Sequence, residues 1–96
     1  MRTYELTFIV RPDISEDAVA AAIEQVQQWV TADDGNKVLR VDKWGRRKLA
    51  YPINNQREGH YVLLDVSVAP SSIAEIERNL KLSDDILRYL LVRSDE

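Results

Sequence analysis

The sequence predicts one α+β domain, in which four strands form an antiparallel sheet and two helices cover one of its faces. Two patterns recur along the 96 residues. Alternation of apolar and polar residues indicates half-buried strands, and apolar spacing of three and four residues indicates amphipathic helices. These segments follow one another in the order strand, helix, strand, strand, helix, strand, or βαββαβ. A chain of this length buries roughly two-thirds of its unfolded surface, which is enough for one core.

The first strand is expected over Arg2–Val10, because alternate residues there are apolar and share one face: Tyr4, Leu6, Phe8 and Val10. Pro12 ends the strand, since proline withdraws a backbone donor from the sheet.

The first helix follows, capped either by Ser15 alone or by Asp13 together with Glu16. We expect it to run to about Ala32, with Gly35 as the left-handed residue after its end. Its apolar stripe consists of Val19, Ile23, Val26 and Val30, with Trp29 packing at the edge.

A second strand is expected over Lys37–Ile53, with a bulge or bend at Gly45. The polar segment 54–59 predicts a long hairpin loop before a third strand. In that third strand one face carries Val62, Leu64, Val66 and Val68.

The second helix is predicted to begin with a capping box of Ser72 and Glu75. Ile73, Ile76 and Leu80 form its buried stripe. The last strand is expected over Ile86–Arg93.

This order is that of the ferredoxin-like fold, with both helices on one face of the sheet. We expect the opposite face to be uncovered and to carry large apolar side chains: Tyr61, Leu63, Leu87, Tyr89 and Leu91. A contiguous apolar patch of this kind indicates a partner surface. The alternative is that an antiparallel sheet simply tolerates some apolar residues on its wet face.

Basic residues are concentrated between Arg40 and Lys48, which hold five of the thirteen in a chain of net charge −3. Within this segment Asp42 is the only acid. One interpretation is an edge strand protected by charge against aggregation. The other is an arm that contacts phosphates, opposite an acidic side formed by residues 13–34, which hold acids and no Lys or Arg.

No enzymatic site is predicted. The single histidine, His60, has no partner histidine or acidic pair close in sequence, and Ser72 is better explained as a helix cap than as a nucleophile. The sequence has no cysteine and no glycine-rich phosphate loop, so we expect no metal or cofactor. It also has no apolar run of ~20 residues and no export leader, so we expect a cytoplasmic protein.

Base stacking of the RNA-recognition-module type is disfavoured, because in the segment Arg57–Leu64 only Tyr61 keeps an expected aromatic position. What remains is contact with RNA through cations. The candidates are Arg2, Arg46, Arg47, Lys48, Arg88 and Arg93.

Several segments together resemble the bacterial small-subunit ribosomal protein six family. They are Met1-Arg2-Thr3-Tyr4-Glu5, Trp44-Gly45-Arg46-Arg47-Lys48-Leu49-Ala50-Tyr51-Pro52-Ile53, Gly59-His60-Tyr61, Ile86-Leu87-Arg88 and Leu91-Val92-Arg93. The resemblance covers essentially the whole sequence, and the run from Trp44 to Ile53 is its most specific part. Many members carry a longer charged tail, whereas this sequence ends at Ser94-Asp95-Glu96.

The resemblance implies a ferredoxin-like protein without catalytic activity that binds 16S ribosomal RNA in the central domain, or platform, of the small subunit. It implies a heterodimer with the small basic ribosomal protein eighteen, which would supply the positive field that an acidic chain lacks. By position, Arg2, Arg46, Arg47, Arg88 and Arg93 correspond to RNA contacts. Candidates for the protein partner are Trp44, Leu49, Tyr51, Tyr61, Leu63, Tyr89 and Leu91. The alternative is a non-ribosomal interaction or ligand-sensing domain with the same fold.

Overall fold

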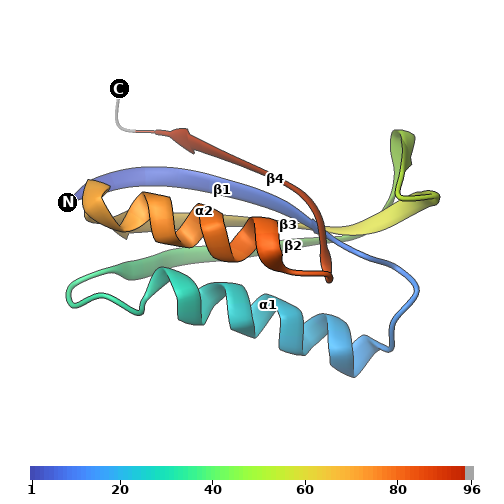
Figure 1. Cartoon of the computed structure of the whole chain (residues 1–96), viewed down its shortest axis with the longest axis horizontal. Coiled ribbons are helices and arrows are strands. Elements are labelled where there is room, and N and C mark those ends of the chain that lie inside the picture. Colours follow the sequence, from blue (N-terminus) through green and yellow to red (C-terminus); the bar gives the residue numbers. More distant parts are fainter. Residues whose placement is uncertain (95–96) are drawn as a thin grey trace.

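The computed structural model describes residues 1–94 and confirms the ferredoxin-like βαββαβ order. The elements are β1 (Arg2–Val10), α1 (Glu16–Val30), β2 (Lys37–Ile53), β3 (Gln56–Val68), a 3-10 turn (Pro70–Ser72), α2 (Ile73–Leu82) and β4 (Ile86–Arg93). The four strands form one antiparallel sheet in the order β2-β3-β1-β4. Both helices lie on the same side of this sheet (Figure 1). Asp95 and Glu96 of the C-terminal segment lie outside the described residues.

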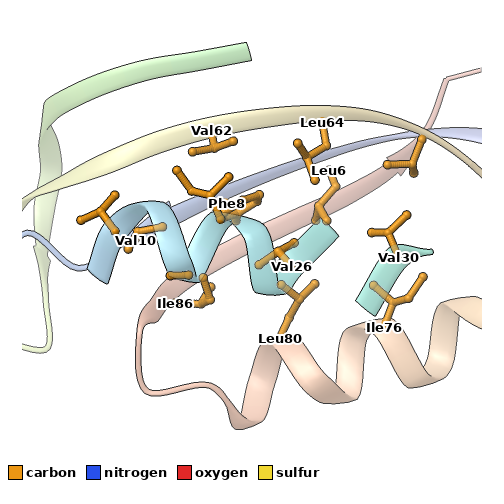
Figure 2. Packing of buried hydrophobic residues seen from close by; sticks show 14 of the residues in the cluster. Leu6, Phe8, Val10, Val26, Val30, Val62, Leu64, Ile76, Leu80 and Ile86 are labelled. Atoms are coloured by element: carbon orange, nitrogen blue, oxygen red, sulfur yellow. The ribbon is translucent and has the colours of Figure 1, made fainter. Parts of the chain in front are cut away.

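The core lies between the helices and the two central strands, as the alternation predicted. Figure 2 shows the side chains of Leu6 and Phe8 in β1 and Val62 and Leu64 in β3 gathered above those of the helices. Phe8, Leu6 and Leu64 are fully buried. Burying a side chain of this kind contributes about 1.5–3 kcal/mol, so this layer supplies much of the stability of the fold. Trp29 packs at its edge, as expected.

Helix α1 is capped by Ser15 alone, whose hydroxyl accepts a hydrogen bond from the Ala18 amide at 3.1 Å. The helix ends at Val30 with Thr31 as its C-cap, earlier than the predicted end near Ala32. Gly35 does have a left-handed φ of 86°. It lies in the turn that leads to β2, however, and not directly after the helix, so its predicted role was wrong.

The hairpin between β2 and β3 is tighter than predicted. Asn54 and Asn55 have φ values of 50° and 66°, the backbone of a two-residue type I′ turn, which asparagine tolerates well. Ile53 therefore pairs directly with Gln56, and β3 begins there instead of near His60. The segment predicted as a long loop therefore consists of the Asn54-Asn55 turn and the first residues of β3.

Helix α2 does not begin with the predicted capping box. The backbone of Ser72 is helical and its side chain makes no capping bond. Instead the Ser72 hydroxyl donates to Asp33 at 2.6 Å and accepts from the buried side chain of Asn36 at 3.0 Å. Asn36 also donates to the Val30 carbonyl and accepts from the Ala69 amide. This buried network joins the end of α1, the start of β2 and the start of α2.

The faces of β4 are the reverse of those predicted for Tyr89 and Leu91. Tyr89 lies opposite Phe8, and both Tyr89 and Leu91 pack against the core on the helix side. Leu90 and Val92 lie on the face that the helices leave uncovered, where they are 61% and 43% exposed. Because side chains alternate with period two, the register with β1 decides the face of every residue in the strand. A register shift beside Val10 accommodates Leu87 as an extra residue.

Candidate nucleic-acid and partner interface

The β2–β3 hairpin extends past the helices and turns toward the other side of the sheet (Figure 1). We call its distal part, residues 45–58, the arm, and the sheet face without helices the open face. Gly45 begins the arm with a φ of 81°, next to a register shift in the pairing of β2 with β3. Only glycine adopts this conformation at little cost, and the resulting bulge bends the strand. The predicted bulge at Gly45 is confirmed.

The cations of the arm point to both of its sides. Arg46 lies opposite His60 and Arg47 opposite Gly59, and successive residues of a strand face opposite ways. Arg46 Nε lies 3.4 Å from Glu58 Oε1, in an exposed ion pair. Arg47 Nε donates to the carbonyl of Trp44 at 3.3 Å. These contacts leave other donors of each guanidinium available, since each has five N–H groups.

Arg88 joins the arm from the opposite edge of the sheet. It lies on β4 opposite Ile9, and its side chain reaches Tyr51 near the tip of the arm. The guanidinium donates from Nη1 to the Tyr51 hydroxyl, and its central carbon lies 5.8 Å from the centre of the Tyr51 ring. The fold therefore brings Arg88 into contact with the arm that carries Arg46, Arg47 and Lys48, and we call these four the arm-end cations.

Arg2 and Arg93 do not join this group. Arg2 lies opposite Val68 at the start of β1. The arm lies beyond the other end of β1, where Val10 is opposite His60. Eight steps along a strand cover about 26 Å. Arg93 lies opposite Tyr4, on the face of the sheet that carries the core side chains. The six predicted RNA-binding residues thus form two groups at opposite ends of the sheet.

Aromatic and aliphatic side chains gather where the arm leaves the sheet. The rings of Trp44 and Tyr61 stack with centroids 6.2 Å apart and planes 6° from parallel. Beside them Ile9, Tyr61 and Leu90 line a shallow depression of about 230 Å³ on the open face, which Arg88 borders. Ile9 is only 7% exposed although no helix covers it. The open face thus carries an apolar patch, as the sequence predicted, but with a different set of β4 residues.

The other candidate partner residues are distributed along the same surface. Leu63 lies half-buried on the open face between Thr7 and Asp42, and Leu49 lies half-buried in the arm. The sequence interpretation missed Ile9, Leu90 and Val92 as open-face apolar residues. For Ile9 the sequence did contain the information, because alternation in β1 places Ile9 on the face away from the core. For Leu90 and Val92 it was absent, because their neighbours Tyr89 and Leu91 are equally apolar.

Acidic residues occupy the open face farther from the arm. Glu5 and Asp65 lie directly opposite each other on β1 and β3. Arg40 contacts Asp65 at 3.6 Å and Asp42 at 3.2 Å, so this cation is already surrounded by carboxylates. Like charges placed opposite each other in a sheet are unfavourable. Charge on the open face therefore changes from positive at the arm to negative away from it. A cationic group lying over Glu5 and Asp65 would relieve the repulsion between them.

The Asp13 carboxylate contacts the arm next to its turn, where Gln56 lies opposite Ile53. Arg11 binds both oxygens of Asp13, at 2.6 and 2.8 Å, and Gln56 at the start of β3 donates to the same carboxylate at 3.3 Å. The hydrogen bond from Arg11 lowers the pKa of Asp13 below its ordinary value of 3.8. The loop after β1 is thereby connected to the hairpin.

Residues 1–94 hold neither a cluster of metal-ligand side chains nor a membrane-spanning helix. No group of three or more His, Cys, Asp or Glu side chains in this range is placed to hold a metal ion. Within the same residues no helix is long and apolar enough to cross a membrane.

The chain is similar to one protein family over nearly all of its length. Residues 3–93 match the family described as ribosomal protein S6. The small ribosomal subunit protein bS6 of Moorella thermoacetica is 45% identical over 96 residues, which cover 100% of this chain and 97% of that protein. The corresponding protein of Desulforamulus reducens is 41% identical, with 100% of both chains covered.

The fold is similar to that of a solved relative. The crystal structure of 30S ribosomal protein S6 from Thermotoga maritima matches with a TM-score of 0.91 at 27% sequence identity, covering 97% of this chain and 87% of the other.

Proposed function

Because this chain belongs to the ribosomal protein S6 family of the small ribosomal subunit, we propose that it binds 16S ribosomal RNA in the central domain jointly with ribosomal protein eighteen. Membership in the family makes it a structural, non-enzymatic component of the ribosome, and so a protein of the cytoplasm. The family also decides against the alternative of a non-ribosomal interaction domain.

The observation that supports the RNA proposal is the contact of Arg88 with an arm that carries Arg46, Arg47 and Lys48, in a chain that is acidic overall. Arginine forks bind phosphate oxygens through paired N–H groups. Contacts of this kind position a protein on folded RNA without reading its bases. Arg2 and Arg93 are proposed as a second, separate RNA contact at the other end of the sheet.

The open face is proposed to bind the protein partner. Trp44, Tyr61 and Leu63 of the predicted set lie on it, with Leu49 and Tyr51 in the adjoining arm. We propose Leu90 and Val92 in place of Tyr89 and Leu91, because the latter two pack against the core. A basic partner fits this face, since Glu5 and Asp65 are negative and adjacent. The same partner would offset the net charge of −3, which opposes RNA binding by the chain alone.

The test is a titration against a central-domain fragment of 16S ribosomal RNA at two salt concentrations, with and without ribosomal protein eighteen. We expect tight, salt-sensitive binding only with the partner present. The double variant Arg46→Ala, Arg47→Ala should bind more weakly, with the slope of log affinity against log salt reduced by about two, roughly one per lost phosphate contact. Unchanged affinity and slope in this variant would refute the role of the arm.

A further inference from the structure

We infer that Tyr51 is a positioning residue, which holds the arm and Arg88 together so that cations from the two edges of the sheet form one RNA-binding surface. The Tyr51 hydroxyl accepts a hydrogen bond from Arg88 Nη1, and the Tyr51 ring lies 5.8 Å from the guanidinium carbon. That these cations bind RNA rests on the proposed function, whereas the contact between Tyr51 and Arg88 is independent of it.

The contact closes a gap that the sheet order creates. β2 and β4 are the two outer strands, separated by β3 and β1. The arm continues β2 and β3, whereas Arg88 belongs to β4, so no backbone pairing connects the two. Tyr51 bridges this separation: the arm bends away from the helices beyond the end of the sheet (Figure 1), and the Tyr51 side chain meets that of Arg88.

The tip of the arm has the freedom to bend in this way. Regular pairing with β3 stops at Lys48, opposite Glu58, and resumes only at Ile53, opposite Gln56. The residues between, which include Tyr51, are therefore outside the hydrogen-bonded ladder of the described hairpin. A segment with few ladder bonds opens easily, so side-chain contacts hold the tip: Tyr51 with Arg88 of β4, and Gln56 with Asp13 of the loop after β1.

The geometry leaves Arg88 able to bind a phosphate. The Tyr51 oxygen accepts a hydrogen bond from Nη1 only. A guanidinium has five N–H groups in a rigid fork, so other donors remain for a phosphate. The cation also lies over the Tyr51 ring, in a cation–π contact that adds to the hydrogen bond. Holding Arg88 and the arm in place before RNA arrives reduces the ordering cost of binding.

The first experiment measures amide hydrogen exchange in the free protein. Tyr51→Phe removes the hydroxyl and keeps the ring, and Arg88→Gln removes the cation from the other strand. Both should speed exchange of the arm amides by about threefold or more, since each breaks the same charge-assisted hydrogen bond. Arg78→Gln, the same change at an exposed position of α2, is the matched control and should leave the arm unchanged. Arm exchange unaffected by Arg88→Gln would overturn the inference.

The second experiment repeats the RNA titration in the presence of ribosomal protein eighteen. Tyr51→Phe should weaken binding by about three- to tenfold, the net scale of one exposed hydrogen bond. Added to Arg88→Gln, it should weaken binding no further, because Tyr51 acts through Arg88. Effects that multiply in the double variant, or an unaltered affinity of Tyr51→Phe, would overturn the positioning role. The exchange experiment contains no RNA, so a failure of the proposed function is distinguishable from a failure of this inference.

Discussion

The side chain of Ile9 lies directly against the backbone of Gly59: a Cβ atom at position 59 would lie 2.2 Å from Ile9 Cγ2. Ile9 is opposite Tyr61, so β1 and β3 meet closely at the point where the arm begins. The absence of a side chain at Gly59 lets Ile9 be buried on a face without helices. The stacked Trp44 and Tyr61 lie next to it.

Gly59→Ala should lower the free energy of unfolding by about 1–3 kcal/mol, the usual cost of forcing extra volume into a packed site. Urea denaturation measures this change. Ile9→Ala removes the opposing Cγ2 atom, so the double variant should be more stable than the sum of the two single effects predicts. Additive effects would show that the close contact with Ile9 is not what excludes a side chain at Gly59.

Asn36→Ala should lower the free energy of unfolding by about 2–3 kcal/mol, because it leaves buried partners of a hydrogen-bond network unsatisfied. Those partners are the Val30 carbonyl, the Ser72 hydroxyl and the Ala69 amide. Gln28→Ala, on the exposed face of α1, is a control and should change stability by less than about 0.5 kcal/mol. Equal effects of the two substitutions in thermal or urea denaturation would contradict a structural role for the network.

The ion pair of Asp13 and Arg11 should make a pH-dependent contribution to stability. Folding lowers the pKa of Asp13 below 3.8, chiefly through its hydrogen bond from Arg11. The contribution is therefore fully present above the unfolded pKa and is lost as pH falls through the folded one. Asp13→Asn should lower the melting temperature at pH 7, and the difference from the unmodified protein should disappear once the pH is below the folded pKa of Asp13. A difference independent of pH would rule out this origin.

Glu58→Gln should strengthen RNA binding. The Glu58 carboxylate lies 3.4 Å from Arg46 and competes with phosphate for that cation. Replacing it with a neutral group of the same shape also removes one negative charge from the arm, so we expect a gain of about two- to fivefold at low salt. Glu77→Gln on α2 makes the same charge change away from the arm and should have a smaller effect. Equal gains from both variants would indicate net charge alone.

Leu90→Asp and Leu91→Asp should have opposite consequences. Leu91 packs against the core, so its replacement should lower the free energy of unfolding by about 2–4 kcal/mol. Leu90 is 61% exposed on the open face. Its replacement should change stability by less than about 1 kcal/mol and weaken binding of ribosomal protein eighteen. Denaturation and a partner titration together check both outcomes, and the reverse pattern would refute the assigned faces of β4.

Much of the fold was predictable because its patterns are local. Alternation in β1 and β3 identified the core residues Leu6, Phe8, Val62 and Leu64 correctly. The bulge at Gly45 was also predicted correctly, since a glycine inside a strand often marks a bulge or a tight bend. Helix ends and caps were less predictable. Ser72 serves a buried network with Asn36, a residue that no local motif identifies.

The amino-acid sequence was enough to establish the order of the elements, the core faces of the central strands and the cationic character of the arm. Those properties depend on residues close together in the chain, where hydrophobic period and charge are already visible. The faces of β4 were set only in three dimensions, because its apolar residues on both sides carry no alternation and its register with β1 assigns them. The folded chain also brings Arg88 to Tyr51 while Arg2 and Arg93 lie at the far end. The distance of Arg2 and Arg93 from the arm follows from antiparallel pairing, which determines which strand ends lie together, whereas the contact of Arg88 with Tyr51 also needs the bend that begins at Gly45.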